Sequence, residues 1–154
     1  RAFGHKDDEY ISVGINARTS ELHAAVGLCN LPRVELFIES RRELNELYRK
    51  NLLHDDITFP VIPEGIKYNY SYFPVLFNSE GTVLRIKEVL SNNGINSRRY
   101  FFPSLNTLEY LNPSFCMTSE RIASRVLCLP MYHELSKDDV IRICNLITDI
   151  LSGR

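Results

Sequence analysis

The spacing of apolar residues along the chain predicts five helices and two strands. The expected helices follow Thr19 or Ser20, cover about 32–53, 82–92 and 119–126, and close the chain after Ser136. The expected strands are rich in aromatic and β-branched residues and cover 68–77 and 95–101. The order helix, helix, strand, helix, strand, helix, helix predicts an α+β sandwich. Helices would pack on one face of a small, mostly antiparallel sheet.

The first helix follows a polar segment that the sequence predicts to be extended. Thr19 or Ser20 is expected to cap this helix, and Glu21 places negative charge in its first turn. Its apolar stripe, which we expect to be buried, consists of Leu22, Ala25, Val26 and Cys29. A buried helix would hold the preceding loop rigidly, so Asn16 and Arg18 on that loop are candidate binding residues. An asparagine turn and a surface arginine are the alternative by residue type alone.

The later helices each show an apolar face and a recognisable end. Pro32 suits the first turn of the second helix, Gly94 ends the third, and Ser136 caps the last. The residues expected to face inward are Val34, Phe37, Ile38, Leu44, Leu47, Tyr48 and Leu52, then Val83, Ile86 and Leu90, and finally Val140, Ile143, Cys144, Ile147, Ile150 and Leu151. Pro74 predicts a strand edge or bulge, and 128–131 an extended connection.

Composition and charge narrow the class of protein. The chain has 154 residues, 44% of them hydrophobic and 24% charged, which is typical of one soluble globular domain. A net charge of −1 gives no support for binding nucleic acid or a membrane. The four cysteines lie far apart without a Cys-x-x-Cys pair, so we expect buried free thiols in a reducing cytoplasm. The four histidines lack metal-ligand spacing, and no metal site is predicted.

Further candidate residues lie on the two expected strands, the most telling of them at the end of the strand 95–101. Arg98, Arg99 and Tyr100 combine charge suited to a pyrophosphate with a flat face suited to a base or sugar. Tyr70 or Tyr72, on the expected strand 68–77, could line a sugar pocket. The alternatives are an exposed arginine pair without a ligand and a half-buried strand with alternating aromatic residues.

The run from Gly14 to Leu28 resembles a motif of the DegT/DnrJ/EryC1/StrS sugar aminotransferases. The motif reads Gly-x-Asn-x-Arg-x-(Ser/Thr)-Glu-Leu-x-Ala-Ala-x-Gly-Leu. The segments 68–75, 94–105 and 127–136 are also similar to runs of that family, and the resemblance extends over nearly the whole chain. It implies a pyridoxal-phosphate enzyme of fold type I that acts on nucleotide-linked keto-sugars. In the family, this first run lies well after the lysine that forms the Schiff base. No lysine here has the family's Ser/Thr-rich context, so the resemblance implies no catalytic residue in this chain.

The resemblance also implies a domain organisation and an activity. Residues 1–154 would be the small C-terminal domain of the enzyme, with 1–53 as the helical connection from a missing large domain. The intact enzyme would transfer an amino group, from glutamate as donor, to a nucleotide-linked keto-deoxy sugar for polysaccharide or lipopolysaccharide synthesis. The fragment alone is expected to be inactive. Two alternatives stay open: a dehydratase with histidine in place of the lysine, and a non-catalytic module for dimerisation or nucleotide-sugar binding.

The same resemblance suggests roles for the candidate residues. Asn16 would reach the cofactor phosphate of the other subunit of a homodimer, and Arg18 would lie near that phosphate or the substrate. Arg99 stands where the family commonly has a substrate-side histidine, and a second histidine is replaced as well. The Arg-Arg-Tyr-Phe-x-Pro version is similar to the branch that acts on dTDP-linked 3-keto- or 4-keto-6-deoxy sugars. Without its large domain, the fragment is expected to self-associate.

Overall fold

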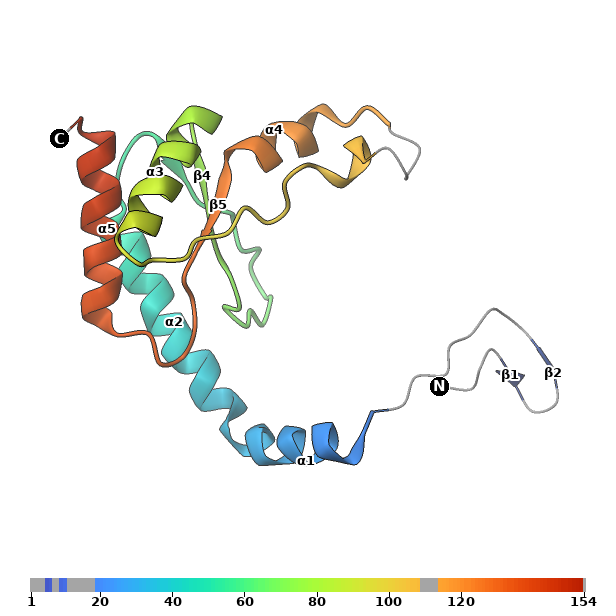
Figure 1. Ribbon diagram of the computed structural model, residues 1–154. Coiled ribbons are helices and arrows are strands. Elements are labelled where there is room, and N and C mark those ends of the chain that lie inside the picture. Colours follow the sequence, from blue (N-terminus) through green and yellow to red (C-terminus); the bar gives the residue numbers. More distant parts are fainter. Residues whose placement is uncertain (1–4, 7–8, 11–18, 109–113, 154) are drawn as a thin grey trace. The chain divides into compact units, whose positions relative to one another are not determined.

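The computed structural model describes residues 5–6, 9–10, 19–108 and 114–153 of the chain, the first two pairs by their backbone alone (Figure 1). The chain divides into two compact units, Arg1–Glu35 and Leu36–Arg154, and each is described by itself. Asn16 and Arg18 lie outside the described residues. The predicted connecting role of 1–53 therefore stays a prediction.

The first unit contains a short hairpin and a helix. Strands β1 (His5–Lys6) and β2 (Glu9–Tyr10) pair antiparallel, and helix α1 (Glu21–Asn30) is followed by the 3₁₀ turn η1 (Leu31–Arg33). The predicted cap is confirmed, because the Ser20 hydroxyl accepts a hydrogen bond from the His23 backbone N–H at 3.3 Å. The predicted burial of α1 is wrong for this unit, since α1 has no buried residue. Burying an apolar stripe requires a second packed layer, which the described residues of this unit do not provide.

The second unit is the predicted α+β sandwich. Its helices are α2 (Val34–Asn51, beginning in the first unit), α3 (Glu80–Asn92), α4 (Met117–Arg125) and α5 (Lys137–Leu151), with a 3₁₀ turn η2 (Leu105–Thr107). Strands β3 (Ile57–Thr58), β4 (Phe73–Phe77) and β5 (Val126–Leu129) form an antiparallel sheet in the order β3-β4-β5. Helix α3 lies against this sheet, and α5 lies beside α3 (Figure 1).

The core forms between the sheet and the inner faces of α2, α3 and α5. Phe73, Val75 and Phe77 alternate with half-buried residues along β4, so one face of this strand is fully covered. The ring of Tyr48 on α2 stacks on Phe73 at 4.6 Å between centroids. The predicted inner residues that are buried are Leu44, Tyr48, Leu52, Val83, Ile86, Leu90, Val140, Ile143, Cys144, Ile147 and Ile150. The predicted inward faces of α3 and α5 are therefore confirmed, whereas the face of α2 is buried only toward its C-terminal end.

The strands differ from the sequence prediction in three places. Strand β4 begins at Phe73 and not at 68, because Tyr70 adopts a φ of 52° and turns the chain out of the extended conformation. The segment 95–101 forms a single bridge, between Arg98 and Cys128, and no strand. The first half of the expected connection 128–131 belongs to strand β5 (Val126–Leu129), whose four residues are all buried. Pro74 lies in the central strand, but β3 pairs only with Leu76 and Phe77, so this proline has a neighbouring strand on one side only.

The four cysteines are all free, but the prediction that they are buried holds for two of them. Cys128 and Cys144 are buried, whereas Cys29 and Cys116 are exposed. Cys29 lies on the uncovered α1, and Cys116 lies at the N-terminal end of α4 next to a loop. Burial raises the pKa of the Cys144 thiol to about 12 and that of the Cys128 thiol above its ordinary value.

We expect Cys116 to react with a thiol reagent much faster than Cys128 and Cys144 near neutral pH. Only the thiolate is nucleophilic, and burial both excludes the reagent and keeps the two inner thiols protonated. The order of labelling can be followed by mass spectrometry of peptides, with the unfolded chain as a control in which all sites react. Early labelling of Cys144 in the folded chain would contradict the expectation.

Candidate substrate-binding site

Tyrosine and arginine side chains from two distant segments meet at one end of the sheet. We call Tyr68, Tyr70, Tyr72, Arg98 and Tyr100 the tyrosine–arginine cluster. Arg98 Nη1 donates a hydrogen bond to the Tyr100 hydroxyl at 2.7 Å, and the rings of Tyr100 and Tyr72 meet edge to face at 5.4 Å. The rings of Tyr68 and Tyr70 meet in the same way at 4.9 Å, and the Tyr68 hydroxyl donates to the Tyr72 carbonyl at 3.4 Å. Each member of the cluster thus contacts another.

Pairing in the sheet explains why these two segments meet. The N–H of Arg98 donates to the carbonyl of Cys128 at 3.0 Å, and the Cys128 N–H donates back at 2.8 Å. Cys128 also pairs with Pro74 on its other side, two residues after Tyr72. The segment 98–100 therefore lies beside β5 at the end where β4 begins.

The cluster is open to solvent and combines two kinds of recognition. Arg98 is exposed, and 56% of Tyr72 is exposed, so both can reach a ligand. A guanidinium donates several hydrogen bonds in a plane and suits a phosphate or diphosphate. Phenol rings offer flat apolar faces and a hydroxyl, which suit a sugar or a base. The arrangement can bind an anionic, ring-containing molecule.

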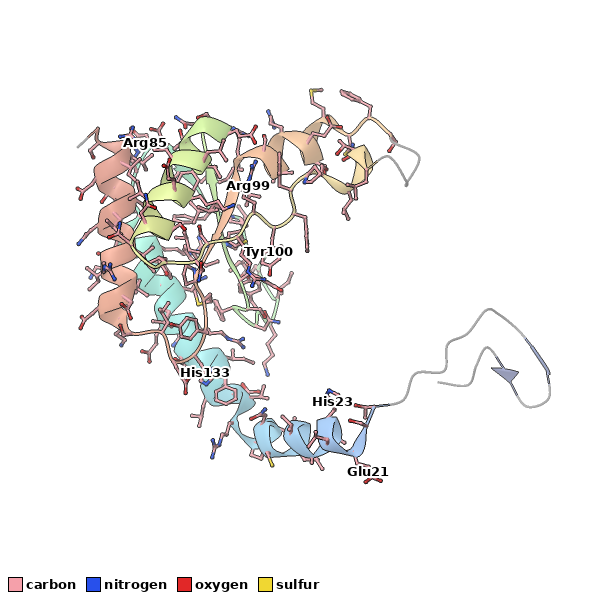
Figure 2. All side chains as sticks on the ribbon, in the orientation of Figure 1. Glu21, His23, Arg85, Arg99, Tyr100 and His133 are labelled. Carbon is pink, nitrogen blue, oxygen red and sulfur yellow. The ribbon has the colours of Figure 1, made fainter. Side chains whose placement is uncertain are left out.

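Arg99 lies apart from this cluster. Its Nη2 donates to Glu80 Oε1 at 2.7 Å and to the Ser124 carbonyl at 3.0 Å, and its guanidinium carbon lies 3.5 Å from the centroid of the Phe102 ring. Only 11% of the side chain is exposed. Figure 2 shows Arg99 near α3 and α4, the two helices whose residues it contacts. Of the residues predicted to bind substrate, the structure brings Arg98, Tyr100, Tyr70 and Tyr72 together and places Arg99 elsewhere.

Two residues that contact the predicted site residues were not predicted from the sequence. Tyr68 joins Tyr70 to Tyr72, and Glu80 holds Arg99. The alternating tyrosines at 68, 70 and 72 were a signal for the first. No sequence signal links Glu80 to Arg99, which is 19 residues away.

The described residues do not by themselves form a pyridoxal-phosphate site. A lysine that binds this cofactor needs a desolvated setting that lowers its pKa. Lys50, Lys67, Lys87 and Lys137 are all exposed. Within the described ranges there is also no group of three residues suited to a metal ion. No helix in this part of the chain combines the length and apolarity that crossing a bilayer requires.

The structure defines the class of fold first: a small α+β domain with an exposed cluster of tyrosine and arginine side chains at one end of its sheet. The chain belongs to the DegT/DnrJ/EryC1/StrS aminotransferase family, whose sequence pattern matches residues 1–148. This confirms the family resemblance of the sequence.

Individual proteins of this family are similar over most of the chain. A dTDP-4-amino-4,6-dideoxy-D-glucose transaminase of Shigella dysenteriae is 39% identical over 96% of the chain, and one of Escherichia coli is 33% identical over 94%. In each case the chain covers 42% of the relative. The crystal structure of DesI in the presence of its TDP-sugar product superposes with a TM-score of 0.80 at 29% identity, over 92% of this chain and 38% of DesI. The chain thus spans about two fifths of the length of the proteins it matches.

Proposed function

We propose that this chain is the C-terminal part of a pyridoxal-phosphate-dependent aminotransferase. The intact enzyme transfers an amino group from glutamate to a nucleotide-linked keto-deoxy sugar in polysaccharide or lipopolysaccharide synthesis. The family match over residues 1–148 carries this proposal, and the names of the relatives support the sugar class. The fraction of each relative that is matched supports a role as one part of a longer enzyme.

The tyrosine–arginine cluster is the proposed contact with the nucleotide sugar. Arg98 binds the diphosphate, and Tyr100, Tyr72 and Tyr70 contact the sugar or the base. The hydrogen bond between Arg98 and the Tyr100 hydroxyl supports this arrangement because it directs both groups to the same exposed surface. Arg99 was also predicted from the sequence to bind the substrate, but its side chain contacts Glu80 and the Ser124 carbonyl instead of the cluster.

The cofactor contacts are proposed from the family motif. Asn16 and Arg18 bind the cofactor phosphate or acidic groups near it, and Asn16 acts across the subunit boundary of a cytoplasmic homodimer. Pyridoxal phosphate, when bound, withdraws electrons from the carbon that exchanges its amino group. The lysine that anchors the cofactor is proposed to come from a part of the enzyme outside this chain. The residues of this chain bind and orient the cofactor phosphate and the nucleotide sugar.

The proposal predicts a defined product from the full-length protein. Incubation with pyridoxal phosphate, glutamate and dTDP-4-keto-6-deoxy-D-glucose is expected to yield the dTDP-linked amino sugar, seen by mass spectrometry, and one equivalent of 2-oxoglutarate. The 154-residue chain assayed alone is the control and is expected to form neither.

Two results would contradict the proposal. One is a full-length protein that forms no amino sugar from any nucleotide-linked keto-sugar offered. The other is amino-sugar formation by the 154-residue chain itself, which would place the catalytic lysine within it.

A further inference from the structure

We propose that Arg99 is a positioning residue that holds the tyrosine–arginine cluster in place, and not a ligand of the nucleotide sugar. The inference rests on the proposed function for what the cluster binds, and it gives the two adjacent arginines separate roles. Three observations support it: the side-chain contacts of Arg99, the backbone pairing of Arg98 with Cys128, and the ion pair between Arg99 and Glu80.

Arg99 joins three parts of the fold at one point. Glu80 is the first residue of α3, and Ser124 is in the last turn of α4, so one guanidinium nitrogen bonds the beginning of one helix and the end of another. The Phe102 ring packs on the same guanidinium, so Arg99 also contacts the segment that follows Tyr100. Through these contacts, Arg99 fixes the segment that carries Arg98 and Tyr100 to α3 and α4.

The backbone explains why neighbouring arginines point in different directions. Both backbone groups of Arg98 bond to Cys128, which fixes the segment beside β5. From this bridge the Arg98 side chain reaches Tyr100, whereas the Arg99 side chain turns to Glu80 and Ser124. The two adjacent arginines therefore have separate partners.

The charges around Arg99 favour its inward position. The Glu80 carboxylate neutralises it at 2.7 Å, and the carbonyl end of α4 adds negative partial charge. With 11% of its side chain exposed, Arg99 would have to break an ion pair and leave Glu80 without its partner in order to reach a diphosphate. Arg98 is exposed and hydrogen-bonds a neutral phenol, so its charge is available to a ligand.

The Glu80→Gln variant separates the two roles because they predict opposite signs. If Arg99 positions the cluster, loosening its partner weakens binding of dTDP to the full-length protein by about tenfold, as expected when a supporting contact is lost. If Arg99 is a ligand, the same change frees its charge and strengthens binding. Arg99→Met is expected to weaken binding to a similar extent, and the double variant to be no weaker than either single one. Titration calorimetry with dTDP measures all three.

A second measurement is independent of any ligand. In Arg99→Met and Glu80→Gln, amide hydrogen exchange of Arg98 and Cys128 is expected to speed up, because their paired hydrogen bonds lose support. Arg85→Met is the matched control, since Arg85 is an exposed arginine on the helix that also carries Glu80. This control is expected to change neither the exchange nor the affinity.

The outcomes distinguish this inference from the proposed function. Tighter binding in Glu80→Gln, or unchanged exchange at Arg98 in both variants, overturns the positioning role. Faster exchange with no dTDP binding in the wild-type protein supports the positioning role and counts against the proposed nucleotide-sugar site.

Discussion

Replacing Phe73 with alanine is expected to lower the free energy of unfolding of the chain by about 3–5 kcal/mol. Phe73 is 1% exposed, stacks on Tyr48 at 4.6 Å and meets Phe59 at 5.6 Å. Its removal leaves a cavity between α2 and the sheet that well-packed neighbours cannot fill. This loss is a large share of the stability of a domain of this size. Urea unfolding followed by circular dichroism measures it.

Phe115→Ala is the matched control for this prediction. The same ring is removed, but Phe115 is 82% exposed, so the change in unfolding free energy is expected to stay within about 0.5 kcal/mol. Equal losses in the two variants would contradict the core described above. A large loss confined to Phe73→Ala would support the packing of β4 against α2.

The second large effect concerns recognition of the nucleotide. Arg98→Met is expected to reduce the affinity of the full-length protein for dTDP by about 10- to 100-fold, because hydrogen bonds to a charged group contribute about 1.5–3 kcal/mol. Methionine keeps much of the length of the side chain and removes its charge and donors. Titration calorimetry measures the loss. The wild-type affinity is expected to fall with added salt, and the variant affinity to fall less.

Arg121→Met controls for a general loss of positive charge. Arg121 is an exposed arginine on α4 outside the tyrosine–arginine cluster, and its removal is expected to leave the affinity for dTDP unchanged. Equal affinity in Arg98→Met and the wild type would remove Arg98 from the proposed site. A similar loss in Arg121→Met would indicate attraction by overall charge instead of a defined contact.

Local sequence patterns predicted the helices well because helix signals are short-range. A hydroxyl followed by an acidic or polar first turn predicted the caps at Ser20 and Ser136, both of which accept a backbone N–H bond. The three-to-four-residue period predicted the buried faces of α3 and α5. Gly94 ends α3 with a φ of 75°, a conformation that favours glycine. These signals lie within a few residues of the feature they predict.

The strands were predicted less well because their signals depend on distant neighbours. The run Val-Leu-Cys-Leu of β5 shows no alternation, since all four residues are buried. Strand β3 has two residues, which is too short for a period to be detected. At 68–72, a tyrosine-rich segment with strand composition turns at Tyr70 instead.

The sequence by itself determined the family, most of the helices and the class of fold, because motifs, caps and periodicity depend on residues close to one another in the chain. It also supplied candidate binding residues. Only the tertiary structure decided which of those residues meet. Arg98 and Arg99 are chemically alike, and their difference comes from the pairing of one with Cys128 and of the other with Glu80. Those partners are 30 and 19 residues away and come close only when the sheet and helices pack, so no local pattern could tell the two arginines apart.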